Sequence, residues 1–408
     1  MKPENLIKEA YLLQEELMKS RRFLHTHPGI GFDIQETTDY VFHQLLQMGY
    51  APSYYGKAGL IALCGNPEKG KTILLRADMD ALPIHEEADI EFRSNNGNMH
   101  ACGHDTHTTM LLGAAKLLKS KEKELQGVVV LCFQPAEELL EGAKDMIRAG
   151  LLKDTKPDAA LMIHIATGTP VDTGSAIVCD GGVSAPAADY FKIQIQGKGC
   201  HGAMPELGVD PITVAAHTIT SLQEIQAREL SMHDEAALTL GNIHAGNAAN
   251  AIPDIATLGG TLRAYDEETR TLIKERMEEI ITGTASLFRA NATLIFTSGC
   301  PTLVNDHTLS KDIAKYMKEL LGSEKSFTVR QLQSMSGNLK SAKATGSEDF
   351  AYFSHEVPSI MLSLAGGKAT DGYTYPLHHP KVTFDETALP IGSAVYAYNA
   401  IRWLEEHA

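Results

Sequence analysis

Four apolar runs, each five residues long, constrain the fold of this chain more than any other feature of the sequence. They are Leu60–Cys64, Thr72–Arg76, Val128–Cys132 and Ala160–His164. Because they are apolar without alternation, the strands that they predict are buried on both faces, which is typical of a sheet covered by helices on each side. Apolar residues at helical spacing predict helices over 5–24, 106–118 and 137–149, and Pro28 and Gly29 end the first of them. The expected fold class is therefore α/β.

Residues 187–300 follow a different pattern, in which apolar and polar residues alternate along Tyr190–Gln196. The order of elements expected there is β-α-β-β-α-β, the split arrangement of ferredoxin-like domains. The expected elements are strand 190–196, helix 211–228, strands 237–244 and 255–265, helix 267–287 and strand 293–297, followed beyond this segment by strand 359–364 and helix 389–404. We therefore expect an α/β domain built from residues 1–186 and 301–408 and interrupted by a smaller inserted domain at 187–300.

The charge balance argues against a nucleic-acid partner. The chain has 36 Lys and Arg residues and 51 Asp and Glu residues, so its net charge is 36 − 51 = −15 at pH 7, and such a surface repels phosphate backbones. No apolar run approaches the roughly 18 residues that a membrane-spanning helix needs, so we expect no membrane partner. The six cysteines form no C-x-x-C pair, which favours a reducing compartment, by default the cytoplasm.

The densest group of chemically reactive side chains lies between His100 and His107. The segment reads His-Ala-Cys-Gly-His-Asp-Thr-His, and thiolate, imidazole and carboxylate groups are the usual ligands of zinc-like metals. The alternative is a polar loop in which Asp105 caps the following helix. Because several such side chains fall within a few positions, we favour metal binding.

A pair of glutamates, Glu137 and Glu138, follows the apolar run that ends at Cys132. Ligands of α/β sheets gather at the carboxyl ends of strands. Adjacent carboxylates point in different directions, so one can bind a metal while the other acts as a general base. The alternative is helix capping, since acidic residues favour the first turn of a helix. The metal-binding cluster upstream favours the catalytic interpretation.

Later histidines complete a set of metal ligands. His164 ends an apolar run, and His378 and His379 lie in the late loop Tyr375–Pro380. A catalytic zinc takes three protein ligands and a water, so five ligands suit two ions about 3.5–4 Å apart that share a hydroxide. The set of five consists of Cys102, His104, Glu138, His164 and one of His378 or His379.

Polar residues in two other places could assist such a site. Asp78 and Asp80 follow a buried strand and could orient the ligand histidines. His201 lies in a glycine-rich turn of the middle segment, and Asn250 and Arg263 come from the same expected domain. Together these three could hold a substrate carboxylate and a developing oxyanion. A turn histidine and a surface-strand arginine without such a role are equally consistent with the sequence.

Taken together, these motifs resemble the metal-dependent aminoacylase and carboxypeptidase family of amidohydrolases. That family includes aminoacylases, hippurate hydrolases, indoleacetyl-amino-acid hydrolases and N-acetyl-diaminopimelate deacetylases. The resemblance covers nearly the whole chain in the family's order, and it looks closest to the subfamily whose metal motif is C-G-H-D-x-H. The matching stretches are Arg76–Pro83, His100–His107, Gln134–Glu138, Gly199–Pro205, Asn250–Asp254, Gly260–Arg263, Gly346–Phe350 and Leu377–Pro380.

The resemblance implies a fold, a cofactor and a role for each matching residue. The implied fold is a zinc-peptidase-like catalytic domain with a mixed sheet, carrying an inserted ferredoxin-like domain that serves as lid and dimerisation surface. The implied cofactors are two divalent metal ions per subunit, zinc or manganese, with nickel or cobalt as alternatives. The implied residues are the metal ligands Cys102, His104, Glu138, His164 and His378, the catalytic residues Glu137 and His201, and the substrate-binding residues Asn250 and Arg263.

The reaction that we expect is hydrolysis of the amide bond of a small N-acyl amino acid by a homodimer or tetramer. Glu137 would take a proton from a metal-activated water and later deliver it to the departing amine. The nearest rival is a carboxypeptidase or dipeptidase that acts on small peptides. Rivals from other classes are a metal-dependent binding protein, against which the base Glu137 argues, and a structural metal scaffold, which predicts a closed metal shell.

Overall fold

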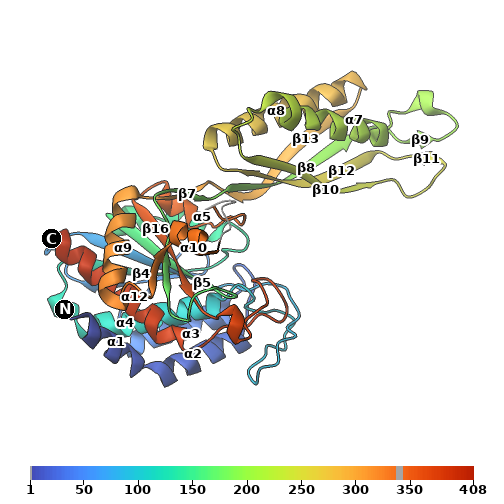
Figure 1. Cartoon of the computed structure of the whole chain (residues 1–408). Helices are drawn as coiled ribbons and strands as arrows, with labels where there is room; N and C mark the ends of the chain where they lie inside the picture. The colour runs from blue at the N-terminus through green and yellow to red at the C-terminus, as the bar shows by residue number, and fades with distance from the viewer. Residues whose placement is uncertain (1, 337–342) are drawn as a thin grey trace. The chain divides into compact units, whose positions relative to one another are not determined.

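The chain divides into two compact units, and each is described by itself (Figure 1). A computed structural model describes residues 2–336 and 343–408. The first unit contains residues 2–184, 304–336 and 349–408, and the second contains residues 185–303 and 343–348. The sequence predicted breaks after residues 186 and 300, whereas the units meet after residues 184 and 303. The short segment 343–348, which the sequence had placed in the larger domain, groups with the second unit.

A mixed sheet of eight strands forms the centre of the first unit. Its strands are β1 (Ser53–Tyr55), β2 (Gly59–Gly65), β3 (Thr72–Asp78), β4 (Val128–Gln134), β5 (Ala159–Ala166), β6 (Ala176–Val178), β15 (Ser326–Thr328) and β16 (Ser359–Ala365). They lie in the order β1-β2-β4-β3-β5-β16-β6-β15. The central strands β4, β3, β5 and β16 are parallel, whereas β2 runs antiparallel to β4 and β6 antiparallel to β16. All four apolar runs form strands of this sheet, so the α/β prediction is confirmed.

Helices cover both faces of this sheet. They are α1 (Pro3–Tyr11), α2 (Gln14–Thr26), α3 (Gln35–Gln47), α4 (His104–Ser120), α5 (Gly142–Arg148), α6 (Leu151–Thr155), α9 (His307–Leu321), α10 (Val329–Ser336), α11 (Ala351–Ser354) and α12 (Ala388–Glu406). Along β3, Ile73, Leu75 and Ala77 belong to a large core that includes residues of α4 and α12. Successive strand residues point to opposite faces. Arg76 therefore lies on the other face, where its guanidinium stacks over the ring of Phe350.

Two predicted helices of this unit differ from the observed ones. The helix predicted over 5–24 is divided into α1 and α2, because the N–H of Leu13 bonds to the carbonyl of Ala10 in a tighter turn. The helix predicted over 137–149 begins only at Gly142, because Ala136 and Leu140 have φ values of 55° and 56° that no right-handed helix allows.

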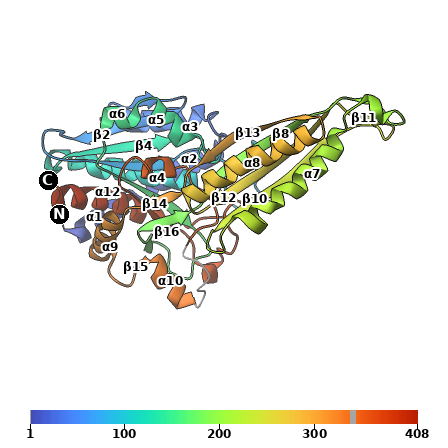
Figure 2. The ribbon, with the colours of Figure 1, turned by 90° about the horizontal axis from the view of Figure 1, so that it is seen from above.

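The second unit is a four-stranded antiparallel sheet with two helices on one face (Figure 2). Its elements are β8 (Ala187–Gln196), α7 (Pro211–Glu224), β10 (Ala236–Ala245), β12 (Ile255–Ala264), α8 (Glu267–Leu287) and β13 (Asn291–Cys300), and the sheet order is β10-β12-β8-β13. The core between sheet and helices includes Phe191, Ile193, Leu258, Ile273 and Met277. The order of these elements along the chain is the predicted one, although α7 ends four residues early and continues as one π-helical segment.

Short strands complete the structure. β9 (Cys200–His201) pairs with β11 (Ala251–Ile252), and β7 (Gly182–Ala185) pairs with β14 (Leu303–Asn305). Among the helices of the described residues, none combines the length and the apolar character that crossing a bilayer requires.

Candidate metal and catalytic site

The five predicted metal ligands of the first unit converge from separate segments. Cys102 lies in the loop before α4, His104 is the first residue of α4, and His164 belongs to β5. Glu138 lies in the turn after β4, and His378 lies in the loop after β16. Their ligand atoms fall within 4.8 Å of one another in three overlapping groups, namely Cys102, His104 and His164; Cys102, Glu138 and His378; and His104, Glu137 and Glu138. The structure thus brings the five predicted ligands and the predicted base Glu137 to one place.

The thiol of Cys102 lies at the centre of the group. Its Sγ is 3.5 Å from Nε2 of His164 and 3.3 Å from Nε2 of His378. Nε2 of His378 in turn lies 3.4 Å from a carboxylate oxygen of Glu138. The backbone joins the same segments, because the N–H of His378 donates to the carbonyl of Ala101 at 2.9 Å. The ring of His378 is thus the one that enters the group, whereas the ring of His379 stacks on Tyr375.

Backbone carbonyls fix which nitrogen each of two imidazoles presents. Nδ1 of His104 lies 2.8 Å from the carbonyl of Asp80, and Nδ1 of His164 lies 2.7 Å from the carbonyl of Ile165. A carbonyl only accepts, so each Nδ1 carries the proton and donates. In the neutral form of each ring Nε2 is then the lone-pair nitrogen, which is the arrangement that orients a ligand histidine in metal sites.

The carboxylate of Asp80 positions the two glutamates. One of its oxygens accepts the N–H of Glu137 at 3.0 Å, and the other accepts the N–H of Glu138 at 3.2 Å. The turn that carries these residues includes the left-handed Ala136 and Leu140. Because Asp80 is 1% exposed, its oxygens have little water to bind instead. The pair therefore has a fixed backbone, and both carboxylates approach Nε2 of His104, at 3.9 Å for Glu137 and 4.0 Å for Glu138.

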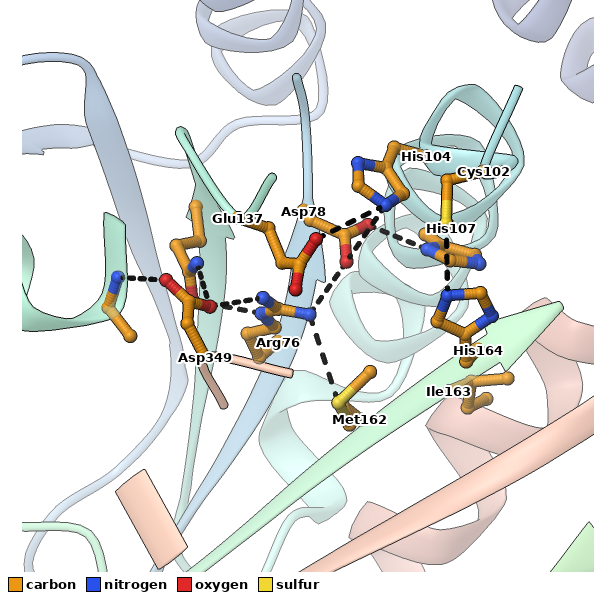
Figure 3. A network of polar contacts seen from close by, with 12 residues as sticks. Arg76, Asp78, Cys102, His104, His107, Glu137, Met162, Ile163, His164 and Asp349 are labelled. Atoms are coloured by element: carbon orange, nitrogen blue, oxygen red, sulfur yellow. Dashed lines mark hydrogen bonds and ion pairs between the residues drawn. The ribbon is translucent and has the colours of Figure 1, made fainter. Parts of the chain in front are cut away.

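A buried chain of hydrogen bonds runs behind the ligands (Figure 3). The guanidinium of Arg76, which is 0% exposed, donates to Asp349 at 2.9 Å, to Gln134 at 2.9 Å and to Asp78 at 2.7 Å. The other oxygen of Asp78 lies 2.6 Å from Nδ1 of His107. The chain of bonds links the ends of β3 and β4 to α4.

His107 continues that chain to the strand of a ligand. Its Nε2 accepts the N–H of Ile165 at 2.7 Å, and Ile165 follows His164. Burial lowers the pKa of His107 to about 4, against the opposing charge of Asp78, so the ring is neutral and its Nε2 is free to accept. Both ring nitrogens are therefore occupied by the protein, and His107 supports the site without being a ligand.

The charges of the site favour a bound cation. Burial raises the pKa of the Cys102 thiol, but the imidazoles of His164 and His104 outweigh burial and lower that pKa to about 6. Burial lowers the pKa of His104, but the charges of Asp78 and Cys102 outweigh burial and hold it well above its usual value. Hydrogen bonds with Cys102 and Glu138 raise the pKa of His378 to about 10. Thiolate and carboxylates thus draw positive charge to this point.

The residues fit two divalent metal ions. Nε2 of His104 is buried and has no hydrogen-bond partner among residues 2–336 and 343–408. Such a nitrogen costs free energy unless it binds something. Sulfur, nitrogen and oxygen donors together suit zinc-like ions, and the two groups that share Cys102 give each of two ions its own ligands.

The three predicted residues of the second unit do not form one group. His201 and Asn250 are neighbours, because His201 pairs with Ala251 across β9 and β11 and the N–H of Gly202 donates to the carbonyl of Asn250 at 2.8 Å. Arg263 lies near the far end of β12, where it stacks over the ring of Tyr190. At about 3.3 Å per strand residue, the eight positions from Ile255 to Arg263 span roughly 26 Å. Within one chain Arg263 therefore lies far from His201 and Asn250, and the roles predicted for these three residues stay predictions.

Sequence reasoning missed several supporting residues of the first unit. It placed Asp78 and Asp80 near the ligand histidines, but it assigned no role to Arg76, His107 or Asp349. One signal was present in the sequence. Arg76 interrupts the apolar run of β3, and a charge in a strand buried on both faces needs a buried counter-charge. Nothing local identified Asp349, which is 273 positions away, as that partner.

The sequence is similar to those of known proteins over most of its length. The pattern of the family described as Peptidase family M20/M25/M40 matches residues 74–402. The chain is 38% identical to IAA-amino acid hydrolase ILR1-like 2 of Arabidopsis thaliana, over 96% of this chain and 86% of that protein. It is 35% identical to N-acetyl-L-cysteine deacetylase of Bacillus subtilis strain 168, over 96% and 89% of the two chains. It is also 32% identical to Thermostable carboxypeptidase 1 of Saccharolobus solfataricus, over 98% of each.

A solved structure resembles the fold. It is the Bacillus subtilis YXEP protein, described as a dinuclear metal binding peptidase from the M20 family. The two structures have a TM-score of 0.76 at 31% sequence identity, over 97% of this chain and 99% of that chain. The similarity therefore extends over nearly the whole chain rather than over a single motif.

Proposed function

The chain belongs to peptidase family M20/M25/M40 and is a hydrolase. On this premise we propose that it cleaves the amide bond of N-acyl amino acids and that Glu137 is the general base. One observation carries the proposal. Glu137 is 6% exposed, and one of its carboxylate oxygens lies 3.9 Å from Nε2 of the predicted ligand His104. The neighbouring glutamate, Glu138, contacts His378, another predicted ligand. A purely metal-binding protein needs only one of the two carboxylates there.

The proposed cofactors are two divalent cations held by Cys102, His104, Glu138, His164 and His378. Bound there, such ions would polarise the scissile carbonyl and lower the pKa of the attacking water. Zinc and manganese are the first candidates, and nickel and cobalt the next. A thiolate ligand favours the softer ions of this set, whereas the carboxylates also suit manganese.

The chain's own residues would move the protons and hold the substrate. Glu137 accepts a proton from the attacking water and delivers it to the nitrogen of the departing amine, so the base is restored at the end of the cycle. Nδ1 of His201 accepts the N–H of Ala203 at 3.0 Å, which leaves Nε2 as the donor for a developing oxyanion. Asn250 and Arg263 would bind the substrate carboxylate, and a bidentate arginine suits that group.

The separation of Arg263 from His201 supports a homodimer, with a tetramer as the next possibility. An acyl amino acid is too short to touch two side chains at opposite ends of β12, so one substrate can meet both only if they come from different chains. We therefore propose that the second unit is a ferredoxin-like lid and dimerisation domain, and that His201 and Asn250 act on a neighbouring subunit's site. We also propose that the enzyme works in the cytoplasm, since no disulfide joins any of its six cysteines.

The test is the substitution Glu137→Gln with Glu141→Gln as control. Glu141 lies in the same turn, where it pairs with Lys144. Hydrolysis of N-acetyl and N-benzoyl amino acids by Glu137→Gln should fall about 10²–10⁴-fold, as loss of a general base does. Metal content should stay normal in both variants, and the control should keep its activity. Substantial turnover by Glu137→Gln would remove this residue from the role.

A carboxypeptidase or dipeptidase is the second candidate, and the likeness to a thermostable carboxypeptidase favours it. Both reactions use the same base and metals, so the site geometry does not separate them. The two reactions are separated by measuring kcat/KM for N-acyl amino acids and for unmodified dipeptides that have the same C-terminal residue. Our proposal requires a higher kcat/KM for the acylated series.

A further inference from the structure

Helix α2 sends two buried basic side chains to the segment that carries the metal ligands. Nε of Arg21 lies 3.1 Å, and Nδ1 of His25 lies 2.9 Å, from the same oxygen of Asp105. Asp105 directly follows His104 in the first turn of α4, and α2 packs against α4. The three side chains are between 1% and 2% exposed. Such an ion cluster is costly unless every charge in it is paired.

His25 connects two carboxylates from different segments, those of Asp105 and Glu86. Its Nε2 lies 3.0 Å from one carboxylate oxygen of Glu86 and 3.2 Å from the other, and Glu86 also accepts the N–H of Ser94 at 2.7 Å. A neutral imidazole has a single N–H, so a ring that donates to two carboxylates is an imidazolium. Arg21 and His25 then balance Asp105 and Glu86, which makes the buried group of four neutral. We call these four residues the α2 cluster.

Arg21 also reaches the other side of the metal-ligand loop. Its Nη1 donates to the carbonyl of Phe384 at 3.2 Å. The ring of Phe384 packs on Gly103, where an added Cβ would lie 3.0 Å from its Cζ. Gly103 stands between Cys102 and His104, so the loop is held by Asp105 on one side and by Phe384 on the other, and Arg21 binds both.

The side chain of Asp105 depends on α2. Both of its side-chain bonds use Oδ2, whereas Oδ1 has no hydrogen-bond partner in the described part of the chain. The neighbouring His104 is held at its ring by Asp80, but the direction in which α4 starts is set by its first turn. Removing His25 would therefore leave Asp105, in the first turn of α4, with one side-chain partner in place of two.

We propose that Arg21 and His25 are positioning residues of the metal site, which hold Cys102 and His104 in the geometry that binds metal. The inference rests on the proposed function only in assuming that Cys102 and His104 are metal ligands. The α2 cluster acts through Asp105 and Phe384, and neither Arg21 nor His25 touches the substrate. An ordinary buried ion cluster would stabilise the fold without affecting the metal.

The experiment compares His25→Gln with His27→Gln in the full chain. Glutamine at position 25 can reach only one of the two carboxylates. His27 lies two positions further on, and its ring bonds to Phe23 and Thr26 of the same helix, which makes it a matched control. The probe is Co²⁺, whose affinity is measured by competition with a chromophoric chelator. The thiolate-to-cobalt absorption band reports the Cys102 bond.

His25→Gln should bind Co²⁺ about 10- to 100-fold more weakly, as loss of a residue that orients ligands does, and its absorption band should shift or weaken. The kcat for an N-acetyl amino acid should fall more than KM rises. The control should match the parent chain in all three measurements. Unchanged affinity and an unchanged band in a folded His25→Gln variant would overturn the proposal.

Two further variants keep the test decisive. If His25→Gln does not fold, Glu86→Gln and Arg21→Lys decide, since each weakens the α2 cluster while keeping a polar side chain of similar size. Normal Co²⁺ binding by both would equally overturn the inference. Cobalt binding needs no substrate, so these results stand even if no amide is hydrolysed. Intact cobalt binding by the parent chain without hydrolysis of any acyl amino acid or peptide would instead contradict the proposed function.

Discussion

The imidazole of His107 connects Asp78 at one nitrogen to the N–H of Ile165 at the other. Leucine at this position would leave one oxygen of Asp78 and the N–H of Ile165 without their partner in the interior, at a cost of about 1–3 kcal/mol for each buried group. Glutamine offers a donor and an acceptor and should recover part of the loss. We therefore expect His107→Leu to lower the thermal stability of the metal-free chain and to weaken metal binding about 10- to 100-fold. His107→Gln should fall between it and the parent.

Thermal denaturation of the metal-free chain and metal titration check the two parts of this expectation separately. Were His107 itself a ligand, metal content would drop by a fixed fraction in both variants, and glutamine would give no recovery in affinity. Equal behaviour of the two variants in titration would thus contradict a supporting role.

Residues like these mark the limit of what the sequence predicts. Cys102, His104, Glu137 and Glu138 are evident because reactive residue types crowd into two short segments, and crowding of that kind is a local property. The carbonyl of Ile165 that fixes the tautomer of His164 leaves no local trace, since any residue supplies a carbonyl. Sequence patterns identify the donors, whereas the groups that orient them depend on how distant segments meet.

At the scale of elements, the start of α4 is the most constrained point of the site. Gly103 precedes its first residue with φ 85°, and a Cβ there would lie 2.5 Å from Cγ2 of Ile165. Gly97 has a similar φ of 89°, but no atom of the residues that the structure describes lies within 4 Å of its own Cβ position. Comparing Gly103→Ala with Gly97→Ala therefore separates steric contact from backbone strain.

Both alanine variants pay the cost of a left-handed residue, of order 1 kcal/mol. Gly103→Ala must in addition displace Ile165 or Phe384, so we expect a lower melting temperature and weaker metal binding than in Gly97→Ala. Differential scanning calorimetry and metal titration measure the two effects. Identical melting temperatures and affinities in the pair would show that the loop tolerates the contact.

The elements themselves were largely predictable, with failures at turns. Continuous apolar runs identified the strands β2, β3, β4 and β5, because burial on both faces favours apolar residues. The helix predicted from Glu137 failed, because periodicity continues through residues whose backbone is left-handed. Asp80 holds the same turn in place, because its oxygens take the N–H groups of Glu137 and Glu138. Tertiary hydrogen bonds, which no local pattern records, override the helical tendency there.

For the whole molecule, the separation of His201 from Arg263 makes a prediction about subunits. If His201 completes a partner's site, a chain with His201→Ala still has its own Glu137, and a chain with Glu137→Gln still has its own His201. A mixed dimer of the two then contains one site with both residues intact. When equal amounts of the two variants exchange subunits at random, about half of the dimers are mixed. Each mixed dimer has one intact site out of two, so about a quarter of the parent activity should return.

The control for this experiment mixes Glu137→Gln chains with chains that carry both substitutions, where no arrangement gives an intact site. Native mass spectrometry of the mixtures verifies that subunits have exchanged. Activity that returns in the first mixture but not in the second requires His201 to act across a subunit boundary, because within one chain neither variant has both residues. If exchange is complete and the first mixture stays inactive, His201 serves its own chain. The roughly 26 Å that β12 spans from Ile255 to Arg263 would then remove either His201 or Arg263 from substrate binding.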